Sequence, residues 1–401
     1  MTSSTALPAN AAPDDTRYRV LTAISLAHFL NDMMQSLILA LYPILKGNYH
    51  LSFGEIGLLT LTYQCTASLL QPLVGLFTDR KPMPRALALA MAATLIGLLL
   101  LAQATTLPGL LLAAALVGTG SAIFHPESSR VARLASGGRH GFAQSLFQLG
   151  GNGGTAAGPL LAALIILPGG QHSVAWFALA ALLAIIVLWQ VGNWYRTHLA
   201  AQPTRAPAPV QAPLAAGRTR LALAVLVGLV IGKYTYMASL HSYYTFYLMQ
   251  HFALDAEAAQ LYLFAFLFAA AAGTLLGGPL GDRIGRRSVI WFSILGTIPF
   301  ALWLPHANLH GTLLLSMAIG FILSSAFSAI LVFAQELVPG KVGTISGLFF
   351  GLAFGIAGLA AAVLGWLADH WGIVGIYQLS AWLPLSGLIA LALPDLRRSG
   401  R

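Results

Sequence analysis

Twelve long apolar segments constrain the fold of this chain more than any other feature. A helix needs about 20 predominantly apolar residues to cross the hydrocarbon core of a bilayer. The segments that meet this need, joined by short links with Gly, Pro or charged residues, are Val20–Leu45, Phe53–Phe77, Arg85–Ala104, Pro108–Arg133, Phe142–Leu167, Val174–Tyr195, Leu221–Leu248, Glu257–Gly281, Ser288–Leu304, Leu309–Gln335, Val342–Ala368 and Ile373–Leu393. The sequence therefore predicts an all-α membrane protein with twelve transmembrane helices.

The charges predict how these helices are oriented. Only 8% of the 401 residues are charged, whereas soluble domains carry about 25%. Nineteen of the 21 Lys and Arg residues fall in segments on one side of the expected helices. Since cytoplasmic loops are enriched in Lys and Arg, we expect both termini in the cytoplasm. The net charge of +9 is spread over seven separate segments, which argues against a nucleic-acid partner.

A Pro- and Ala-rich stretch between Gln202 and Gly217 divides the chain into two halves. The expected division is a tail (1–18), an N-terminal six-helix bundle (19–196), a linker (197–219), a C-terminal six-helix bundle (220–394) and a second tail (395–401). Each half carries the same signature after its second helix, GLFTDRKPMPR from Gly75 and GPLGDRIGRR from Gly278, at an offset of 203 residues.

This signature resembles motif A of the major facilitator superfamily of transporters. The second copy is complete, whereas the first has Pro82 in place of the usual Gly. The resemblance implies two pseudo-symmetric six-helix bundles. We expect the motif residues to gate the cytoplasmic side, because an Asp can cap the N-terminus of a neighbouring helix; these residues are Asp79, Arg80, Asp282 and Arg283. A merely basic loop is the alternative, but it does not explain two copies at one offset.

A glycine stripe on the fifth segment is the second signature. Gly150, Gly154 and Gly158 are four residues apart, and Pro159 follows. Small residues at this spacing allow two helices to approach closely within lipid. The string resembles motif C of superfamily antiporters, which implies a gating role for Gly154, Gly158 and Pro159. Generic packing of small residues is the alternative.

Acidic groups inside a membrane are costly and are usually functional. Asp32 lies in the middle of the first segment, with His28 one turn before it on the same face. We expect Asp32 and His28 to carry the coupling proton, with Glu127 as a further candidate. A static ion pair is the alternative for Asp32, and a local salt bridge with Arg130 is the alternative for Glu127.

A cation lies at a depth similar to that of Asp32 in the second half. Subtracting the repeat offset from Lys233 gives position 30, two residues from Asp32. We expect Lys233 and Asp32 to form a coupling centre, in which Lys233 pairs with Asp32 or with an anionic substrate; a permanent bridge is the alternative. The remaining residues expected to bind substrate are Asn31, His125, Gln148, Asn152, Tyr236 and His241.

Three strings, 27–46, 120–152 and 233–252, resemble the fosmidomycin resistance family of bacterial inner-membrane exporters within this superfamily. The resemblance implies proton-driven antiport of small anionic drugs such as fosmidomycin, a phosphonate hydroxamate. Uptake of a metabolite or organic anion by a facilitator or symporter is the alternative. The sequence has no protease, hydrolase or nucleotide-binding motif, so we expect no enzymatic activity, cofactor or metal. We expect a monomer in the bacterial inner membrane.

Overall fold

The structure is a computed structural model that describes residues 16–51, 53–201, 214–254 and 256–395, and within these ranges all regular secondary structure is helical. The N-terminal half consists of α1 (Tyr18–Tyr49), α2 (Phe53–Arg80), α3 (Ala86–Gln103), α4 (Leu107–Leu134), α5 (His140–Leu161), the π-helical turn η1 (Ala162–Ile166), α6 (Leu167–Gly169), η2 (Gln171–Phe177) and α7 (Ala178–Ala201). The C-terminal half consists of α8 (Ala216–Phe252), α9 (Ala256–Ile284), α10 (Arg286–Trp303), η3 (Leu304–His306), α11 (Leu309–Ser324), α12 (Ala326–Leu337), α13 (Val342–Ser380) and η4 (Leu383–Ala392).

These elements make six membrane-crossing segments in each half, as the sequence predicts. The element α13 is kinked at Gly372, whose φ of 73° few other residues adopt, so that it forms two segments. Among the described residues, nine helices are long and apolar enough to cross a membrane by composition alone. The remaining three long helices are α1, α2 and α5, and α1 carries His28 and Asp32.

The helices begin and end where the sequence provides caps or breakers. The Thr106 side chain accepts a hydrogen bond from Gly109 N at the start of α4, and Asn308 accepts one from Gly311 N at the start of α11. The helices beside the linker run further than expected. They reach Ala201 and restart at Ala216, because the prolines that break a helix occur only between these positions.

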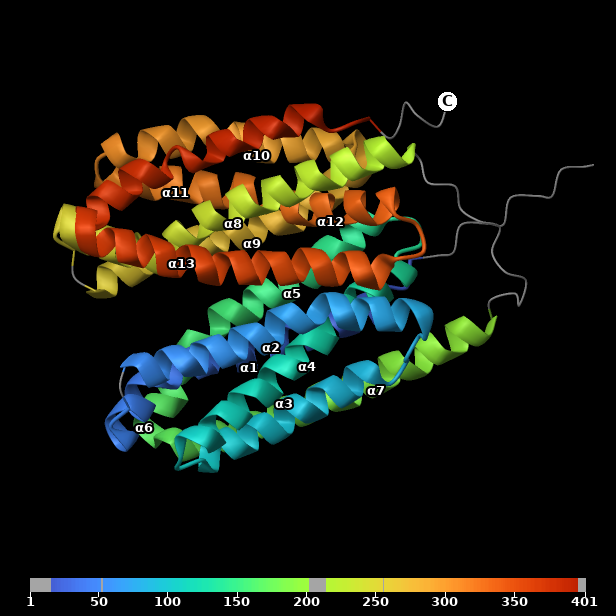
Figure 1. Cartoon of the computed structure of the whole chain (residues 1–401), viewed down its shortest axis with the longest axis horizontal. Helices are drawn as coiled ribbons and strands as arrows, with labels where there is room; N and C mark the ends of the chain where they lie inside the picture. Colours follow the sequence, from blue (N-terminus) through green and yellow to red (C-terminus); the bar gives the residue numbers. More distant parts are fainter. Residues whose placement is uncertain (1–15, 52, 202–213, 255, 396–401) are drawn as a thin grey trace, which may run out of the picture.

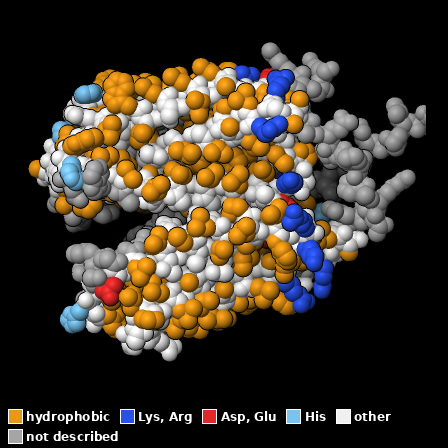
Figure 2. Space-filling model, viewed as in Figure 1, with side chains coloured by type: hydrophobic (Ala, Val, Ile, Leu, Met, Phe, Trp, Pro, Cys, Tyr) orange, Lys and Arg blue, Asp and Glu red, His pale blue; other side chains and the backbone are white. Residues whose placement is uncertain are grey.

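The two halves lie side by side as two layers of helices (Figure 1). In Figure 2, Lys and Arg side chains gather at one end of the molecule, and the surface is hollowed between the two halves at the other. We call these the arginine-rich end and the open end. The cleft between the halves therefore opens away from the basic surface.

Glycines bring the two halves together near the arginine-rich end. A Cβ atom on Gly75 of α2 would overlap the Gly343 backbone of α13. A Cβ on Gly278 of α9 would likewise overlap the Gly141 backbone of α5. Only glycine permits both approaches, so the closed end depends on backbone-to-backbone contact.

Candidate functional site: a buried carboxylate between two histidines

The centre of the site is Asp32, near the middle of α1. It lies fourteen residues after Tyr18, or about 21 Å along the helix at 1.5 Å per residue. His28 Nε2 lies 3.2 Å from Asp32 Oδ2, and His125 Nε2 of α4 lies 3.5 Å from Asp32 Oδ1. The carboxylate is 14% exposed, whereas His28 and His125 are 2% and 0% exposed. Tertiary packing thus joins α1 and α4 through one carboxylate.

Backbone carbonyls fix the orientation of both imidazole rings. His28 Nδ1 lies 2.7 Å from the Phe147 carbonyl oxygen, and His125 Nδ1 lies 2.9 Å from the Ser121 carbonyl oxygen. A carbonyl only accepts hydrogen bonds, so each Nδ1 is the protonated nitrogen. Both Nε2 atoms therefore face Asp32, and neither makes an aligned hydrogen bond. His28, Asp32 and His125 are hereafter the central triad.

Amides complete the surroundings of Asp32. Its Oδ1 atom accepts a hydrogen bond of 2.9 Å from Asn31 Nδ2 and a longer one of 3.4 Å from Gln35 Nε2. Gln35 is held in turn by the Tyr63 hydroxyl of α2, which donates to Gln35 Oε1 at 2.6 Å. The other oxygen, Oδ2, faces His28 Nε2 at 3.2 Å, so polar groups contact both oxygens of the carboxylate.

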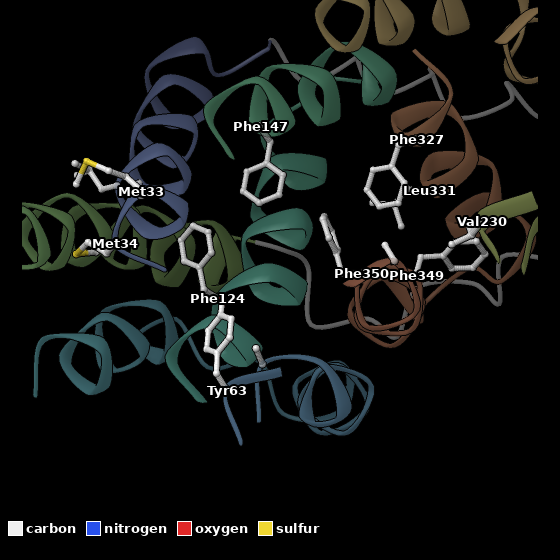
Figure 3. Packing of buried hydrophobic residues seen from close by; sticks show 14 of the residues in the cluster. Met33, Met34, Tyr63, Phe124, Phe147, Val230, Phe327, Leu331, Phe349 and Phe350 are labelled. Atoms are coloured by element: carbon white, nitrogen blue, oxygen red, sulfur yellow. The ribbon is translucent and has the colours of Figure 1, made fainter. Parts of the chain in front are cut away.

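Aromatic rings from both halves cover the central triad on the arginine-rich side. Phe350 of α13 lies 5.2 Å from His125, 6.2 Å from Phe147 of α5 and 5.3 Å from Phe327 of α12, measured between ring centroids. Figure 3 shows Phe147, Phe350 and Phe327 gathered between the helices. Phe354, one turn nearer the open end, also contacts His125. Apolar rings of both halves therefore pack against the triad.

Helix α5 separates its glycine face from its polar face. Gly150 and Gly154 pack directly on the α1 backbone at Ser25 and Phe29, and Gly158 packs on Ser36. On another face, the exposed Asn152 donates a hydrogen bond of 3.1 Å to Thr274 Oγ1 of α9 in the other half. Gln148 is half-buried, and its Oε1 has no hydrogen-bond partner among the described residues. The glycine face holds α1 and the central triad in place, and the polar face meets the C-terminal half.

Lys233 does not pair with Asp32, contrary to our expectation. It is 6% exposed and faces a small cavity inside the C-terminal half, lined by Tyr236 and Ser386 among others. Its Nζ lies 5.4 Å from the Tyr234 ring and 5.5 Å from the Phe327 ring. No ion pair to Lys233 occurs in the described part of the chain. The repeat offset predicts depth but not the direction of the side chain, and α8 turns this residue toward its own bundle.

Two carboxylates lock the halves together at the arginine-rich end. Asp79 of α2 accepts hydrogen bonds from Gly343 N, Thr344 N and Thr344 Oγ1 at the start of α13. Asp282 of α9 accepts bonds of 3.0 Å and 2.9 Å from Gly141 N and Phe142 N at the start of α5. Each half therefore caps a helix of the other, at the N-terminus where a negative charge is favoured.

Arginines hold both of these carboxylates. Arg130 contacts Asp79 at 2.5 Å and Glu127 at 3.3 Å. Arg286 lies 3.1 Å from both Asp282 and Glu336. The contacts of Asp79 and Asp282 with neighbouring helix ends are as the sequence predicts.

The family follows from comparison with known proteins. The sequence pattern of the Major Facilitator Superfamily matches residues 24–246 and 226–400. The chain belongs to the Major Facilitator Superfamily. It is a membrane transporter rather than an enzyme.

Two curated members of the superfamily are similar along most of their length. The fosmidomycin resistance protein of Escherichia coli K12 is 58% identical over 382 residues, which cover 95% of this chain and 94% of that protein. An uncharacterized MFS-type transporter of Bacillus subtilis 168, YfnC, is 41% identical over 392 residues, covering 96% and 94%.

Solved structures of Major Facilitator Superfamily transporters share the fold. FucP in the outward conformation has a TM-score of 0.71 at 15% identity, covering 94% of this chain and 98% of FucP. The human organic anion transporter MFSD10 has a TM-score of 0.73 at 16% identity, covering 95% and 100%. At these identities the likeness concerns the fold alone.

Within this superfamily fold, only some of the predicted site residues come together. His28, Asp32, His125 and Asn31 meet near the middle of α1. Glu127 does not join them: it is 1% exposed and lies beside Arg130, toward the arginine-rich end.

The predicted residues of the other half and of the gate lie elsewhere. Tyr236 is buried beside the Lys233 cavity, and His241 is exposed with its ring against Phe266. Arg80 and Arg283 are exposed. The Pro159 side chain lies outside the described part of the structure.

Three residues of the site, Gln35, Tyr63 and Phe350, were not among those predicted, and no metal was expected. The three triad side chains offer ligand atoms within 4.8 Å of one another, close enough to hold a metal ion. The spacing of His28 and Asp32 was a signal for such a group, but the contribution of His125 depends on tertiary structure. The side chains of His28, Asp32 and His125 therefore form a candidate metal site.

Proposed function

We propose that this protein is a proton-driven antiporter that exports small anionic compounds, such as fosmidomycin, across the bacterial inner membrane by alternating access. The observation that carries the proposal is the central triad, a carboxylate between two histidines near the middle of α1. The 58% identity to a fosmidomycin resistance protein supports export of this class of drug. The partners in this proposal are the small molecule, protons and the lipid bilayer, and nucleic acid has no part in it.

The cleft supports alternating access. If the arginine-rich end faces the cytoplasm, as the positive-inside rule favours, both termini are cytoplasmic and the cleft faces the periplasm. The capped helix ends of α5 and α13 then close the cytoplasmic side. Transport requires these contacts to break while the periplasmic ends approach each other.

The central triad supplies a site for the coupling proton. A lone charge at the bilayer centre costs at least about 2.5–3.5 kcal/mol on insertion scales, and a proton neutralises Asp32. Exchange further requires that proton and drug exclude each other, because a site that bound both together would drive symport. Export of an anion also gains about 2.3 kcal/mol per charge from an inside-negative potential of 100 mV.

Lys233 supports the anionic nature of the cargo. It is a buried cation without an ion pair in the described residues, on a helix whose counterpart in the first half carries Asp32. A rotation of α8 during opening would turn it toward an anion in the cleft. The alternative function, uptake by a facilitator or symporter, needs no exclusion between proton and cargo.

Transport in everted vesicles separates these functions. An antiporter accumulates labelled fosmidomycin when the vesicle interior is acidic, a facilitator ignores the pH gradient, and a symporter loses the drug from the vesicles. Asp32→Asn should abolish gradient-driven accumulation at unchanged expression. Accumulation that is equal with and without the gradient would refute the antiport mechanism.

A further inference from the structure

Two arginines at the arginine-rich end stack on tryptophan rings. The guanidinium carbon of Arg85 lies 4.5 Å from the centre of the Trp189 ring, and that of Arg287 lies 4.2 Å from the centre of the Trp291 ring. Adding the repeat offset of 203 to Arg85 gives position 288, one residue from Arg287. The two halves therefore carry the same arrangement, which the general enrichment of basic residues in cytoplasmic loops does not explain.

Each stack lies where the third and sixth membrane-crossing segments of its half meet. In the first half, a Cβ atom on Gly192 of α7 would overlap the carbonyl oxygen of Pro84, just before α3. In the second half, the indole N–H of Trp291 in α10 donates a hydrogen bond of 2.7 Å to the carbonyl oxygen of Ala390 in η4. Helix α10 and the pair of α3 and α7 lie on opposite outer sides of the molecule (Figure 1). Both stacks are therefore placed where lipid surrounds the protein.

Stacking leaves the hydrogen-bond donors of both guanidinium groups available. A guanidinium that lies over a ring uses its face, while its N–H groups point outward in its own plane. Neither Arg85 nor Arg287 makes a side-chain hydrogen bond or an ion pair with the described residues, and Nε of Arg287 is buried without a partner there. The ion pairs of this end involve Arg130 and Arg286 instead. The two stacked guanidinium groups are thus ready to bind an anion.

Exposed apolar side chains continue each site toward the middle of the membrane. Leu89 of α3 lies one turn deeper than Arg85, and Ile186 of α7 lies one turn deeper than Trp189. Adding the repeat offset to Leu89 gives Phe292 of α10, which is also exposed. A soluble phosphate ion would gain nothing from these side chains, whereas an acyl chain would pack against them. The sites therefore fit an anion that carries a hydrocarbon chain.

We propose that each arginine–tryptophan stack binds the phosphate of an anionic phospholipid, whose acyl chains lie along these apolar side chains. A guanidinium group can donate two parallel hydrogen bonds to phosphate oxygens. The tryptophan ring orients the guanidinium and belongs at the depth of the headgroups, where tryptophan is enriched. A zwitterionic lipid would bring an ammonium group that the guanidinium repels, so the sites favour an anionic lipid.

The charges around the two sites differ. Arg80 and Lys81 are exposed in the segment before Arg85, whereas Asp395 follows η4 by three residues in the second half. The site at Arg85 should therefore hold its lipid more tightly than the site at Arg287. This binding involves neither the coupling proton nor the drug, so the inference is independent of the proposed function.

The test counts phospholipids on the purified full-length protein by native mass spectrometry. The protein in detergent is titrated with phosphatidylglycerol, or with phosphatidylethanolamine of the same acyl chains. The wild type should retain two molecules of phosphatidylglycerol, and Arg287→Gln should retain one; two molecules on this variant would overturn the second site. Phosphatidylethanolamine should bind roughly fivefold more weakly. Equal affinity for both lipids, or displacement of phosphatidylglycerol by equimolar inorganic phosphate, would overturn the inference.

Further variants, made in the Arg287→Gln protein, examine the first site alone. Trp189→Leu keeps every charge and should weaken phosphatidylglycerol binding roughly two- to fivefold, the contribution of an exposed cation–π contact. Arg85→Gln should weaken it roughly tenfold, because hydrogen bonds to the phosphate are lost as well. The matched controls are Arg196→Gln, at an exposed arginine of α7, and Trp303→Leu, at an exposed tryptophan at the other end of α10. Both controls should change the affinity by less than about twofold.

Two outcomes of this series would overturn the inference. Unchanged affinity in Trp189→Leu would show that the ring does not hold the guanidinium for the lipid. A loss in Arg196→Gln as large as the loss in Arg85→Gln would show only a general attraction of anionic lipid to a basic surface.

Discussion

Removing Asp79 should open the arginine-rich end more than removing Asp282. Asp79 accepts three hydrogen bonds from α13, whereas Asp282 accepts two from α5. At the lower limit of about 1.5 kcal/mol for each bond to a charged group, the losses are about 4.5 and about 3 kcal/mol. Each arginine keeps a second carboxylate, Glu127 or Glu336, in the variant, and the comparison counts only the hydrogen bonds between the two halves among the described residues. The difference of about 1.5 kcal/mol predicts roughly tenfold more opening for Asp79→Ala.

The assay uses a reporter cysteine behind the closed end. Ser145 of α5 is fully buried beside Gly278, and its hydroxyl has no hydrogen-bond partner, so Ser145→Cys is a mild change. Cys65 is the single native cysteine and is replaced by Ser. Labelling by a membrane-impermeant maleimide should be slowest in the background protein, faster in Asp282→Ala and fastest in Asp79→Ala. The reverse order, or equal rates in both variants, would show that the number of cross-half hydrogen bonds does not set the stability of closure.

Three more substitutions test other parts of the structure. Gly154→Val should lower the melting temperature, because its side chain would overlap the Phe29 carbonyl, and overpacking costs about 1–3 kcal/mol. Gly358→Ala, where a Cβ would meet only the Gln64 side chain at 3.7 Å, is the control, and equal melting temperatures would contradict this packing. Phe350→Ala should make proteoliposomes leak protons in the absence of drug, since it removes the aromatic ring that contacts residues of both halves. An unchanged rate of proton leak would show that the Phe350 ring does not block protons. Lys233→Met should raise the melting temperature, because it removes a buried ammonium that has no ion pair among the described residues. The same variant should bind fosmidomycin more weakly, and stronger binding would exclude Lys233 as the partner of the anion.

The sequence predicted the fold well because lipid imposes simple rules. Helix length, apolar composition and the distribution of Arg residues are properties of local sequence, and the twelve segments follow from them. The motif around Asp79 and Asp282 recurs at one offset, so its position at a helix end could be read directly. The partners of these carboxylates were less accessible, because Gly343 and Gly141 are remote from them in sequence.

The site was predicted only in part, for a geometric reason. The i, i+4 spacing of His28 and Asp32 places them on one face, so their contact is a local property of α1. His125 joins them through the packing of α4 against α1, and helix periodicity does not specify which faces meet. The same limitation explains Lys233: its depth follows from counting residues, but its direction depends on how α8 is rotated within its bundle.

The crossed caps have a consequence for the origin of this chain. The first half offers Asp79 and receives the cap at the start of α5, while the second half offers Asp282 and receives the cap at the start of α13. Adding the repeat offset of 203 to Gly141 and Phe142 gives positions 344 and 345, so the capped helix starts of the two halves correspond to within one residue. This reciprocity is the contact pattern of a two-fold symmetric dimer. A single six-helix ancestor could therefore have assembled as a pair with both caps already in place, and gene fusion would have required no new contact. The two halves, expressed as separate chains, should accordingly find each other in the membrane.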